Sequence, residues 1–306
     1  MKKYSYVSLI CRNDYMPALV AMLDSFNQIK SKYQMTILVD KSISFENREI
    51  IRFFGASVLE VEQLIPDGFT ILETDVFNSE TNSYPNTDAR PASSRVLLKL
   101  NIFGLTQFDK VVYLDADMLF VKNTDELFDW PSGSAVVDEG WAYVNKVDPQ
   151  FNAGLIVVEP SVKLFNIIKN EVMSYSGKTN WEDILGRNEE ILDDQIIIYN
   201  TIGKNWPHQD ELHLPKFYNL QIAFYNFSAV SLDELRKVKL LHISHGIRPW
   251  AKSWDEVRES CYNRMYLSGA VIYFCWMHQI NRVIDYLSYA GYQSKDLVKC
   301  YIPEYF

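Results

Sequence analysis

Cysteine pairs are absent from this 306-residue sequence. None of its four cysteines has the C-x-x-C spacing of a zinc or redox site. They are scattered at Cys11, Cys261, Cys275 and Cys300. Without a pairing pattern, a disulfide-bonded secreted domain is disfavoured, and we expect free thiols in a reducing, cytoplasmic compartment.

Long hydrophobic runs are also absent. The longest, GAVIYFCWM at 269–277, is too short to span a bilayer. Near the N-terminus two lysines precede a short apolar run, but Arg12 and Asp14 interrupt it and no small-residue cleavage site follows. We therefore expect neither a membrane span nor a signal peptide.

Blocks of charge of one sign are missing as well. The 39 acidic and 30 basic residues give a formal net charge of -9 and are mixed along the chain. This distribution argues against general binding to nucleic acid or to anionic membranes, although it allows a local basic pocket for a phosphate. The apolar content of 48% is sufficient for a full hydrophobic core.

Strand-like apolar runs alternate with amphipathic segments, which predicts an α/β fold with a mainly parallel sheet. Strands are expected at 4–10, 34–40, 56–62, 111–114, 134–138, 154–160 and 237–244. Helices are expected at 15–29, 44–55, 91–104, 161–175 and 189–202. After Trp250 the apolar spacing becomes helical. We therefore divide the chain into a main domain, 1–250, and a helical C-terminal extension, 251–306, packed on it.

Two acids, Asp115 and Asp117, come directly after the apolar strand 111–114. Ligands of such sheets bind beyond the carboxyl ends of the strands. Residues i and i+2 of an extended segment point the same way, so both carboxylates can hold one Mn²⁺ or Mg²⁺ shared with a diphosphate. The D-x-D spacing also fits an ordinary turn, because aspartate is a common turn residue.

A late segment, 237–250, leads a strand into His242, followed by His245, Gly246 and Arg248. An imidazole at a strand end can complete a metal site that two carboxylates begin. Glycine lets backbone approach a phosphate, and arginine binds its oxygens bidentately. The alternative is a buried histidine followed by an ordinary turn.

Three cations, Arg90, Arg95 and Lys99, lie just before and along the helix expected at 91–104. Because Arg95 and Lys99 are four residues apart, they share a helix face. Such a face is usually solvated, but the same arrangement suits a diphosphate beside a cluster of carboxylates.

Polar residues also stand at two other element ends. Asn152 and Gly154 offer a side-chain amide and accessible backbone at the mouth of a strand, which suits hydroxyl groups. The run 193–195, Asp-Asp-Gln, opens an apolar helical stretch. Simple capping of a helix N-terminus is the alternative for this run.

Taken together and in this order, eight segments resemble the family 8 retaining glycosyltransferases, most closely the glycogenin-like and galactinol-synthase-like members. The resemblance covers about residues 4–250. It is carried by LICRNDY, Arg90-Pro91 with Lys99, VVYLDADMLFVKNTDELFD, DEGW, FNAGLIVVEPS, DDQIIIYN, HLPKFYNL and HISHGIRPW. It implies a GT-A fold, a UDP-sugar donor and Mn²⁺, with Mg²⁺ as the alternative metal.

The resemblance also implies roles for individual residues. The implied metal ligands are Asp115, Asp117 and His242. The implied donor-binding residues are Leu9, Ile10, Tyr15, Arg90, Asp115, Ala116, Asp138, Asn152, Ala153, Gly154, Gly246 and Arg248, with Tyr15 stacked on the base. The implied catalytic residues are Lys99, Asp194 and Gln195. Asp194 is the candidate nucleophile of a double displacement, and front-face attack assisted by the donor phosphate stays open.

Some positions depart from the family pattern. His245 stands where a glycine is expected, and Arg248 replaces a lysine, which keeps the charge but changes the geometry of phosphate binding. An acid that the family has three residues before its D-Q pair falls here on Ile191. The self-glucosylated tyrosine of glycogenin has no clear equivalent, because counting from two neighbouring motifs gives either Ser228 or Tyr225.

The expected function is transfer of a hexose, glucose or else galactose, from a UDP-sugar to an acceptor hydroxyl with retention of the anomeric configuration. A glycan, a polyol, a protein tyrosine or a lipid-linked sugar stays open as the acceptor. A homodimer is left open as the oligomeric state. The alternative is a non-catalytic UDP-sugar-binding or scaffold protein of the same fold. A sugar-1-phosphate nucleotidyltransferase is disfavoured, since no glycine-rich loop follows the first strand.

Overall fold

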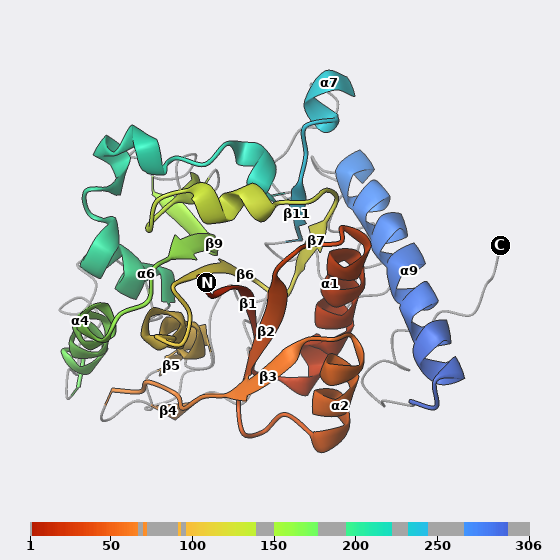
Figure 1. Ribbon diagram of the computed structural model, residues 1–306, viewed down its shortest axis with the longest axis horizontal. Coiled ribbons are helices and arrows are strands. Elements are labelled where there is room, and N and C mark those ends of the chain that lie inside the picture. The colour runs from red at the N-terminus through yellow and green to blue at the C-terminus, as the bar shows by residue number, and fades with distance from the viewer. Residues whose placement is uncertain are drawn as a thin grey trace.

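The computed structural model describes residues 2–66, 70–71, 91–92, 96–138, 150–176, 194–221, 232–243 and 266–292. Within these ranges the chain forms a six-stranded sheet of order β3-β2-β1-β6-β9-β8 with helices around it (Figure 1). The strands are β1 (Tyr4–Ile10), β2 (Gln34–Val39), β3 (Ser57–Glu60), β6 (Lys110–Leu114), β8 (Ala135–Val137) and β9 (Phe151–Val158). The predicted α/β fold is confirmed.

One strand of this sheet, β9, runs against its neighbours. The pairs β1–β2, β1–β6 and β2–β3 are parallel, so the prediction of a mainly parallel sheet is confirmed. Strand β9 is antiparallel to β6, with Leu155 opposite Leu114, and it begins at Phe151 rather than at 154. Residues 152–154 therefore lie beside the carboxyl end of β6.

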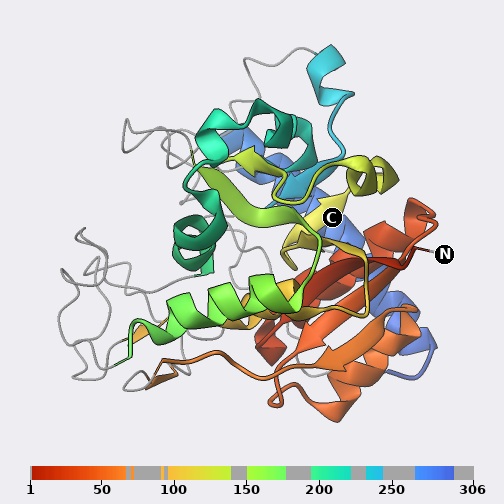
Figure 2. The ribbon, with the colours of Figure 1, turned by 60° about the vertical axis from the view of Figure 1, so that its left-hand side comes forward.

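The central strands are buried on both faces. Every residue of β6 and β9 is buried, as is β1 after Tyr4. This burial follows from helices that cover both sides of the sheet. One side packs against α1 (Met16–Gln28), α2 (Phe45–Phe53) and α9 (Tyr266–Tyr289), and the other against η2 (Val96–Gly104), α4 (Val162–Met173) and α6 (Asp194–Ile198), as Figures 1 and 2 show.

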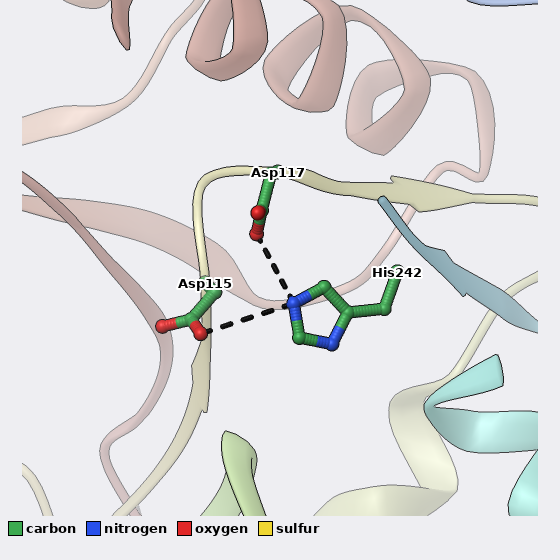
Figure 3. Close-up of side chains that lie close together, drawn as sticks. All are labelled: Asp115, Asp117 and His242. Atoms are coloured by element: carbon green, nitrogen blue, oxygen red, sulfur yellow. Dashed lines mark ion pairs between the residues drawn. The ribbon is translucent and has the colours of Figure 1, made fainter. Parts of the chain in front are cut away.

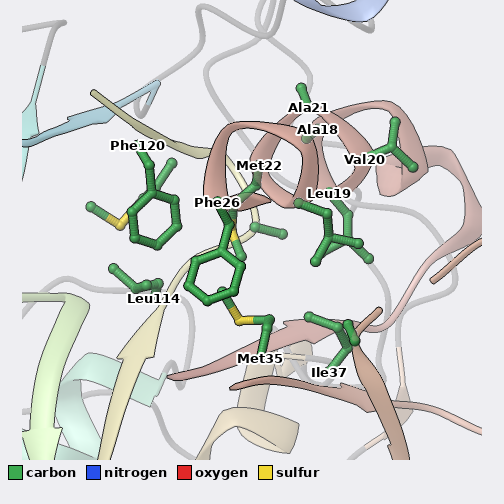
Figure 4. Packing of buried hydrophobic residues seen from close by; sticks show 14 of the residues in the cluster. Ala18, Leu19, Val20, Ala21, Met22, Phe26, Met35, Ile37, Leu114 and Phe120 are labelled. Carbon is green, nitrogen blue, oxygen red and sulfur yellow. The ribbon is translucent and has the colours of Figure 1, made fainter. Parts of the chain in front are cut away.

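Helix α1 is buried on nearly all sides. Leu19 and Phe26 point toward Met35 and Ile37 of β2, whereas Ala18 points away from the sheet (Figure 4). Each large aliphatic or aromatic side chain buried in this way contributes roughly 1.5–3 kcal/mol. The helix therefore packs large side chains against the sheet and has small ones, such as Ala18, on the face directed away from it.

Local signals explain where several helices begin and end. Ser44 and Ser161 precede α2 and α4, and their side chains accept hydrogen bonds from the backbone N–H groups of Asn47 and Leu164. Gly55 follows α2 with a φ of 81°, a conformation that glycine adopts without strain. The helices predicted at 15–29, 44–55 and 161–175 are confirmed within a few residues.

Two predicted helices differ from the structure. Pro91 does not begin a helix: Pro91–Ala92 form strand β5, which pairs with β4 (Thr70–Ile71). The described helical segment η2 (Val96–Gly104) is a 3-10 helix. Pro91 fits this strand because a proline can start a strand that needs no donor from it. Of the helix predicted at 189–202, the described part is α6, continued by a π-helical turn at Tyr199–Gly203.

A second, three-stranded sheet adjoins the first. Its order is β10-β11-β7, with β7 (Met118–Phe120), β10 (Leu220–Gln221) and β11 (Leu240–His242). Strand β7 follows β6 after a short turn, so the two sheets meet at the carboxyl end of β6. Short helical elements complete the described chain: η1 (Asn13–Tyr15), η3 (Asp125–Asp129), η5 (Trp206–His208), η6 (Asp210–Leu212), η7 (Lys216–Tyr218) and α7 (Leu232–Leu235).

The long helix α9 packs against α1, although the two are far apart in sequence (Figure 1). Its buried residues join the same core cluster: Trp276, Ile280, Val283, Ile284 and Leu287. Gln279 and Arg282 also contact Asp24 of α1 through their side chains. The predicted boundary between 1–250 and 251–306 stays a prediction, but α9 is part of the core. No helix among the described residues has the length and apolar content to span a membrane.

The burial of α9 predicts a clear stability effect. Ile280 is fully buried, so Ile280→Ala should lower the free energy of unfolding by about 2–5 kcal/mol. Tyr289 on the same helix is 93% exposed, so Tyr289→Ala should change the free energy of unfolding by less than about 0.5 kcal/mol. Urea unfolding followed by circular dichroism measures both. Equal stabilities for Ile280→Ala and wild type would contradict a shared core.

Candidate functional site

The sheet has a switch point between β1 and β6, where the strand order reverses. Crevices that bind ligands form at such points, beyond the carboxyl ends of the strands. Val7 pairs with Tyr113, and continuing this register sets Leu9 level with Asp115. Ile10 ends β1, and Tyr15 closes the 3-10 turn η1 that follows. The predicted uridine-binding residues and the first acid therefore lie along one edge of the sheet.

Three predicted metal ligands, Asp115, Asp117 and His242, lie together at this edge (Figure 3). The Nε2 atom of His242 is 3.2 Å from Oδ1 of Asp117 and 3.9 Å from Oδ2 of Asp115. One ligand atom of each residue lies within 4.8 Å of the others. The residues come from two strands that pair, because His242 in β11 lies opposite Met118 in β7.

Backbone hydrogen bonds hold this cluster in place. The N–H of Met118 donates to the carbonyl of Asp115 at 3.2 Å and so forms the turn between β6 and β7. The N–H of Ile243 donates to the carbonyl of Asp117 at 3.0 Å, and the N–H of Asp115 donates to the carbonyl of Gly154 at 2.8 Å. The acids are thus fixed against β9 and β11 by main-chain contacts.

The donor set fits a divalent cation. Two carboxylates and one imidazole nitrogen are hard to intermediate ligands, which suit Mn²⁺ and also accept Mg²⁺. Tyr113 donates its hydroxyl hydrogen to Oδ1 of Asp115 at 2.7 Å, which leaves Oδ2 directed toward His242. Acceptor atoms brought this close repel one another unless a cation or a proton lies between them.

Lys99 is buried at the centre of the site. Its Nζ atom is 3.1 Å from Oδ1 of Asp115, forms an ion pair with Asp194, and donates to the carbonyl of Ala153 at 3.3 Å. Burial lowers the pKa of Lys99, but the charges of Asp115 and Asp194 outweigh it, so the pKa lies above its ordinary value. The ammonium form is therefore retained although the side chain is only 6% exposed.

The two carboxylates that share Lys99 are affected differently. Burial raises the pKa of Asp115, but Lys99 and His242 overcome this, and the pKa lies below its ordinary value. Burial also raises the pKa of Asp194, where the opposing effect of Lys99 is weakened by the negative charge of Asp115, and the pKa stays above its ordinary value. Asp115 therefore has the more strongly stabilised charge.

A group of polar residues continues the site along β9. The Nδ2 atom of Asn152 donates to Oδ2 of Asp138 at 3.1 Å, and Nε2 of Gln195 donates to the same oxygen at 3.4 Å. The N–H of Ala153 donates to Oε1 of Gln195 at 3.0 Å. Hence three predicted donor-binding residues, Asp138, Asn152 and Ala153, are in direct contact with one another or with the predicted catalytic residue Gln195.

Gly154 lies where a side chain would not fit. A Cβ atom there would come within 2.6 Å of Cε1 of His242, 2.7 Å of Oδ1 of Asn152 and 3.0 Å of Oδ2 of Asp115. All three distances are shorter than a normal non-bonded contact. Glycine is therefore required for His242 to approach β9.

The sequence analysis missed two residues of the site. Tyr113 was read only as part of the strand, yet its hydroxyl binds Asp115. Asn219, within HLPKFYNL, had no role assigned, yet its Oδ1 is 2.8 Å from Nδ1 of His242. The only available signal was its place in that motif. Several predicted residues lie outside the described ranges: Arg90, Arg95, Ile191, Asp193, Tyr225, Ser228, His245, Gly246 and Arg248.

Comparisons with known proteins identify the family and the fold. A sequence model of glycosyl transferase family 8 matches residues 6–254. Glycogenin-1 of Homo sapiens is 26% identical over 265 residues, which cover 85% of this chain and 66% of glycogenin-1.

Solved structures share the fold at 18% identity. The glycosyltransferase GlyE of Streptococcus pneumoniae TIGR4 aligns with a TM-score of 0.52 over 96% of this chain and 66% of GlyE. The galactosyltransferase LgtC, in complex with donor and acceptor sugar analogs, aligns with a TM-score of 0.50 over 87% of this chain and 95% of LgtC. The family model covers most of the chain, and the sheet has the expected topology. The chain therefore belongs to glycosyl transferase family 8 and has the GT-A fold of a glycogenin-like glycosyltransferase.

Proposed function

We propose that this glycosyltransferase moves a hexose from a UDP-sugar to an acceptor hydroxyl, with Mn²⁺ as the metal and with retention of the anomeric configuration. Glucose is the first sugar to test, because glycogenin-1 is a relative, and galactose is the second, because LgtC is named a galactosyltransferase. A glycan, a polyol or a protein would supply the hydroxyl. The cytoplasmic location expected from the sequence stays a prediction.

The observation that carries this proposal is the cluster of Asp115, Asp117 and His242 at the switch point of the sheet. In the proposal these three side chains hold the metal. A bound divalent cation supplies positive charge that stabilises a leaving diphosphate. Leu9, Ile10 and Tyr15 lie at the end of β1 along the same edge, where we propose that they bind uridine.

Residues of β9 and α6 are proposed to orient the sugar. Asp138, Asn152 and Gln195 already form a hydrogen-bonded group, and such a preorganised group can receive hydroxyls at little entropic cost. The proposal gives Arg90, Gly246 and Arg248 contacts with the diphosphate, and these stay predictions.

Asp194 is our proposed nucleophile for a double displacement, and front-face attack is the other retaining route. In the double displacement, the carboxylate of Asp194 would attack the anomeric carbon while the bond between that carbon and the UDP oxygen breaks. An acceptor hydroxyl would then attack the same carbon and displace Asp194. The ion pair with Lys99 favours the charged form of this buried carboxylate and orients it. The same contact would anchor α6 if attack came from the front face.

A donor screen tests the proposed function. Purified protein with UDP-glucose or UDP-galactose should release UDP only when Mn²⁺ is present. The Asp115→Asn, Asp117→Asn double variant should lose at least about 100-fold in rate, because it removes charge that stabilises the transition state. Tight binding of UDP and Mn²⁺ without turnover, across donors and acceptors, would instead favour a non-catalytic UDP-sugar-binding protein.

Gly154→Ala tests the proposed metal site, and a control glycine elsewhere distinguishes this effect from a general loss of stability. Because a Cβ atom at 154 meets His242, Asn152 and Asp115, this variant should bind Mn²⁺ at least about 10-fold more weakly than wild type. Gly55→Ala is the control, since its positive φ costs about 1 kcal/mol while no atom lies within 4 Å of the added carbon. Calorimetric titration gives the affinities, and unchanged Mn²⁺ binding in Gly154→Ala would argue against these ligands.

The shared lysine can be tested by unfolding. Lys99→Met should lose about 3–5 kcal/mol in the free energy of unfolding, because the buried carboxylate of Asp194 and the partly exposed one of Asp115 lose their cation. Adding Asp194→Asn to this variant should recover part of that loss, since one unpaired charge is removed. Chemical denaturation measures both. An additive double variant would mean that Lys99 and Asp194 do not interact.

A further inference from the structure

Asn219 connects the metal cluster to the polar group along β9. Its Oδ1 atom is 2.8 Å from Nδ1 of His242, and its Nδ2 atom donates to Oδ1 of Asn152 at 2.9 Å. Asn219 is 1% exposed, His242 3% and Asn152 7%. The three side chains form a continuous buried chain of hydrogen bonds.

The direction of every bond in this chain is fixed by one backbone group. The N–H of Gly154 can only donate, and it lies 3.0 Å from Oδ1 of Asn152, so that atom must be the oxygen. The other end of the same amide agrees, because Nδ2 of Asn152 donates to a carboxylate oxygen of Asp138. Asn219 must then present its NH₂ group to Asn152 and its oxygen to His242.

The tautomer of His242 follows from this orientation. A carbonyl oxygen 2.8 Å from Nδ1 requires a hydrogen on Nδ1. In the neutral ring the lone pair is therefore on Nε2, the atom that points at Asp117 and Asp115 (Figure 3). In the opposite tautomer, the lone pair of Nδ1 would face the oxygen of Asn219, and the hydrogen on Nε2 would occupy the direction of the proposed metal.

We propose that Asn219 is a positioning residue that fixes His242 in the Nδ1–H tautomer and thereby turns the Nε2 lone pair toward the metal. This inference rests on the metal site of the proposed function. Gly154 contributes to this arrangement in two ways. Its lack of a side chain lets His242 approach β9, and its N–H fixes the orientation of the amide groups of Asn152 and Asn219. Partners that orient a ligand histidine in this way typically contribute 10–100-fold in metal affinity.

Variants at 219 can separate the tautomer from simple packing. Asn219→Leu keeps a similar volume and removes the acceptor. Asn219→Asp keeps an acceptor for Nδ1–H but loses the donor to Asn152. Asn47→Leu is the matched control, because Asn47 is also fully buried and its Nδ2 donates to another asparagine, Asn13, at 2.8 Å.

The first measurement is a long-range ¹H–¹⁵N spectrum of ¹⁵N-histidine-labelled, metal-free protein, recorded at rising pH until the spectrum shows a neutral His242 ring. Burial lowers the pKa of His242, but the charge of Asp117 outweighs this and the pKa lies above its ordinary value. His242 is one of five histidines and is assigned by comparison with His242→Asn. Wild type, Asn219→Asp and Asn47→Leu should show the Nδ1–H tautomer. Asn219→Leu should lose it and show Nε2–H or a mixture.

The second measurement is Mn²⁺ affinity by calorimetry, with thermal unfolding to confirm that each variant is folded. Asn219→Leu should bind about 10–100-fold more weakly than wild type, and Asn47→Leu within about twofold of it. The Nε2–H tautomer in wild type would overturn the inference, as would an unchanged tautomer in folded Asn219→Leu. Failure of wild type to bind Mn²⁺ would contradict the proposed function instead, because the tautomer is read without metal.

Discussion

The ammonium group of Lys99 is the constraint on which the site depends. It brings together the end of β6, the start of α6 and the backbone of β9, because Asp115, Asp194 and the Ala153 carbonyl all contact it. Without this cation, the buried carboxylate of Asp194 and the partly exposed one of Asp115 could not lie so close together, since both are wholly or partly removed from water and repel each other. The positive charge therefore holds together β6, α6 and β9, which are distant in sequence. The other polar contacts of the site depend on the relative positions of these three elements.

The direction of β9 complements this charge. A parallel strand beside β6 would deliver its last residues to the functional edge, but an antiparallel strand delivers its first ones. Asn152, Ala153 and Gly154 therefore lie next to Asp115 and contribute one side-chain amide and four backbone groups, the N–H and C=O of Ala153 and of Gly154, to the same edge. Hydrogen bonds between amides and carboxylates then extend from α6 through β9 to β11, so both sides of the site are held by one network.

The sequence predicted the parallel strands and the three residues of the candidate metal site, because an apolar run that ends in Asp115 and Asp117 or in His242 is a local signal. It could not predict that β9 runs backwards, since an apolar run carries no direction. Pro91 was misread because a helix start and a strand start both tolerate a residue without an N–H. Asn219 was missed because its role depends on contacts with Asn152 and His242, which lie 67 and 23 residues away in sequence.

The packing of α9 on α1 has a consequence for how the chain folds during synthesis. Helix α1 leaves the ribosome before α9, since residues 29–265 lie between the two helices. Translation proceeds at roughly 5–20 residues per second, so the surface of α1 that α9 covers stays exposed for on the order of ten seconds or more. During that interval the nascent chain carries an apolar surface that it cannot yet bury, which is the kind of surface that chaperones protect from aggregation.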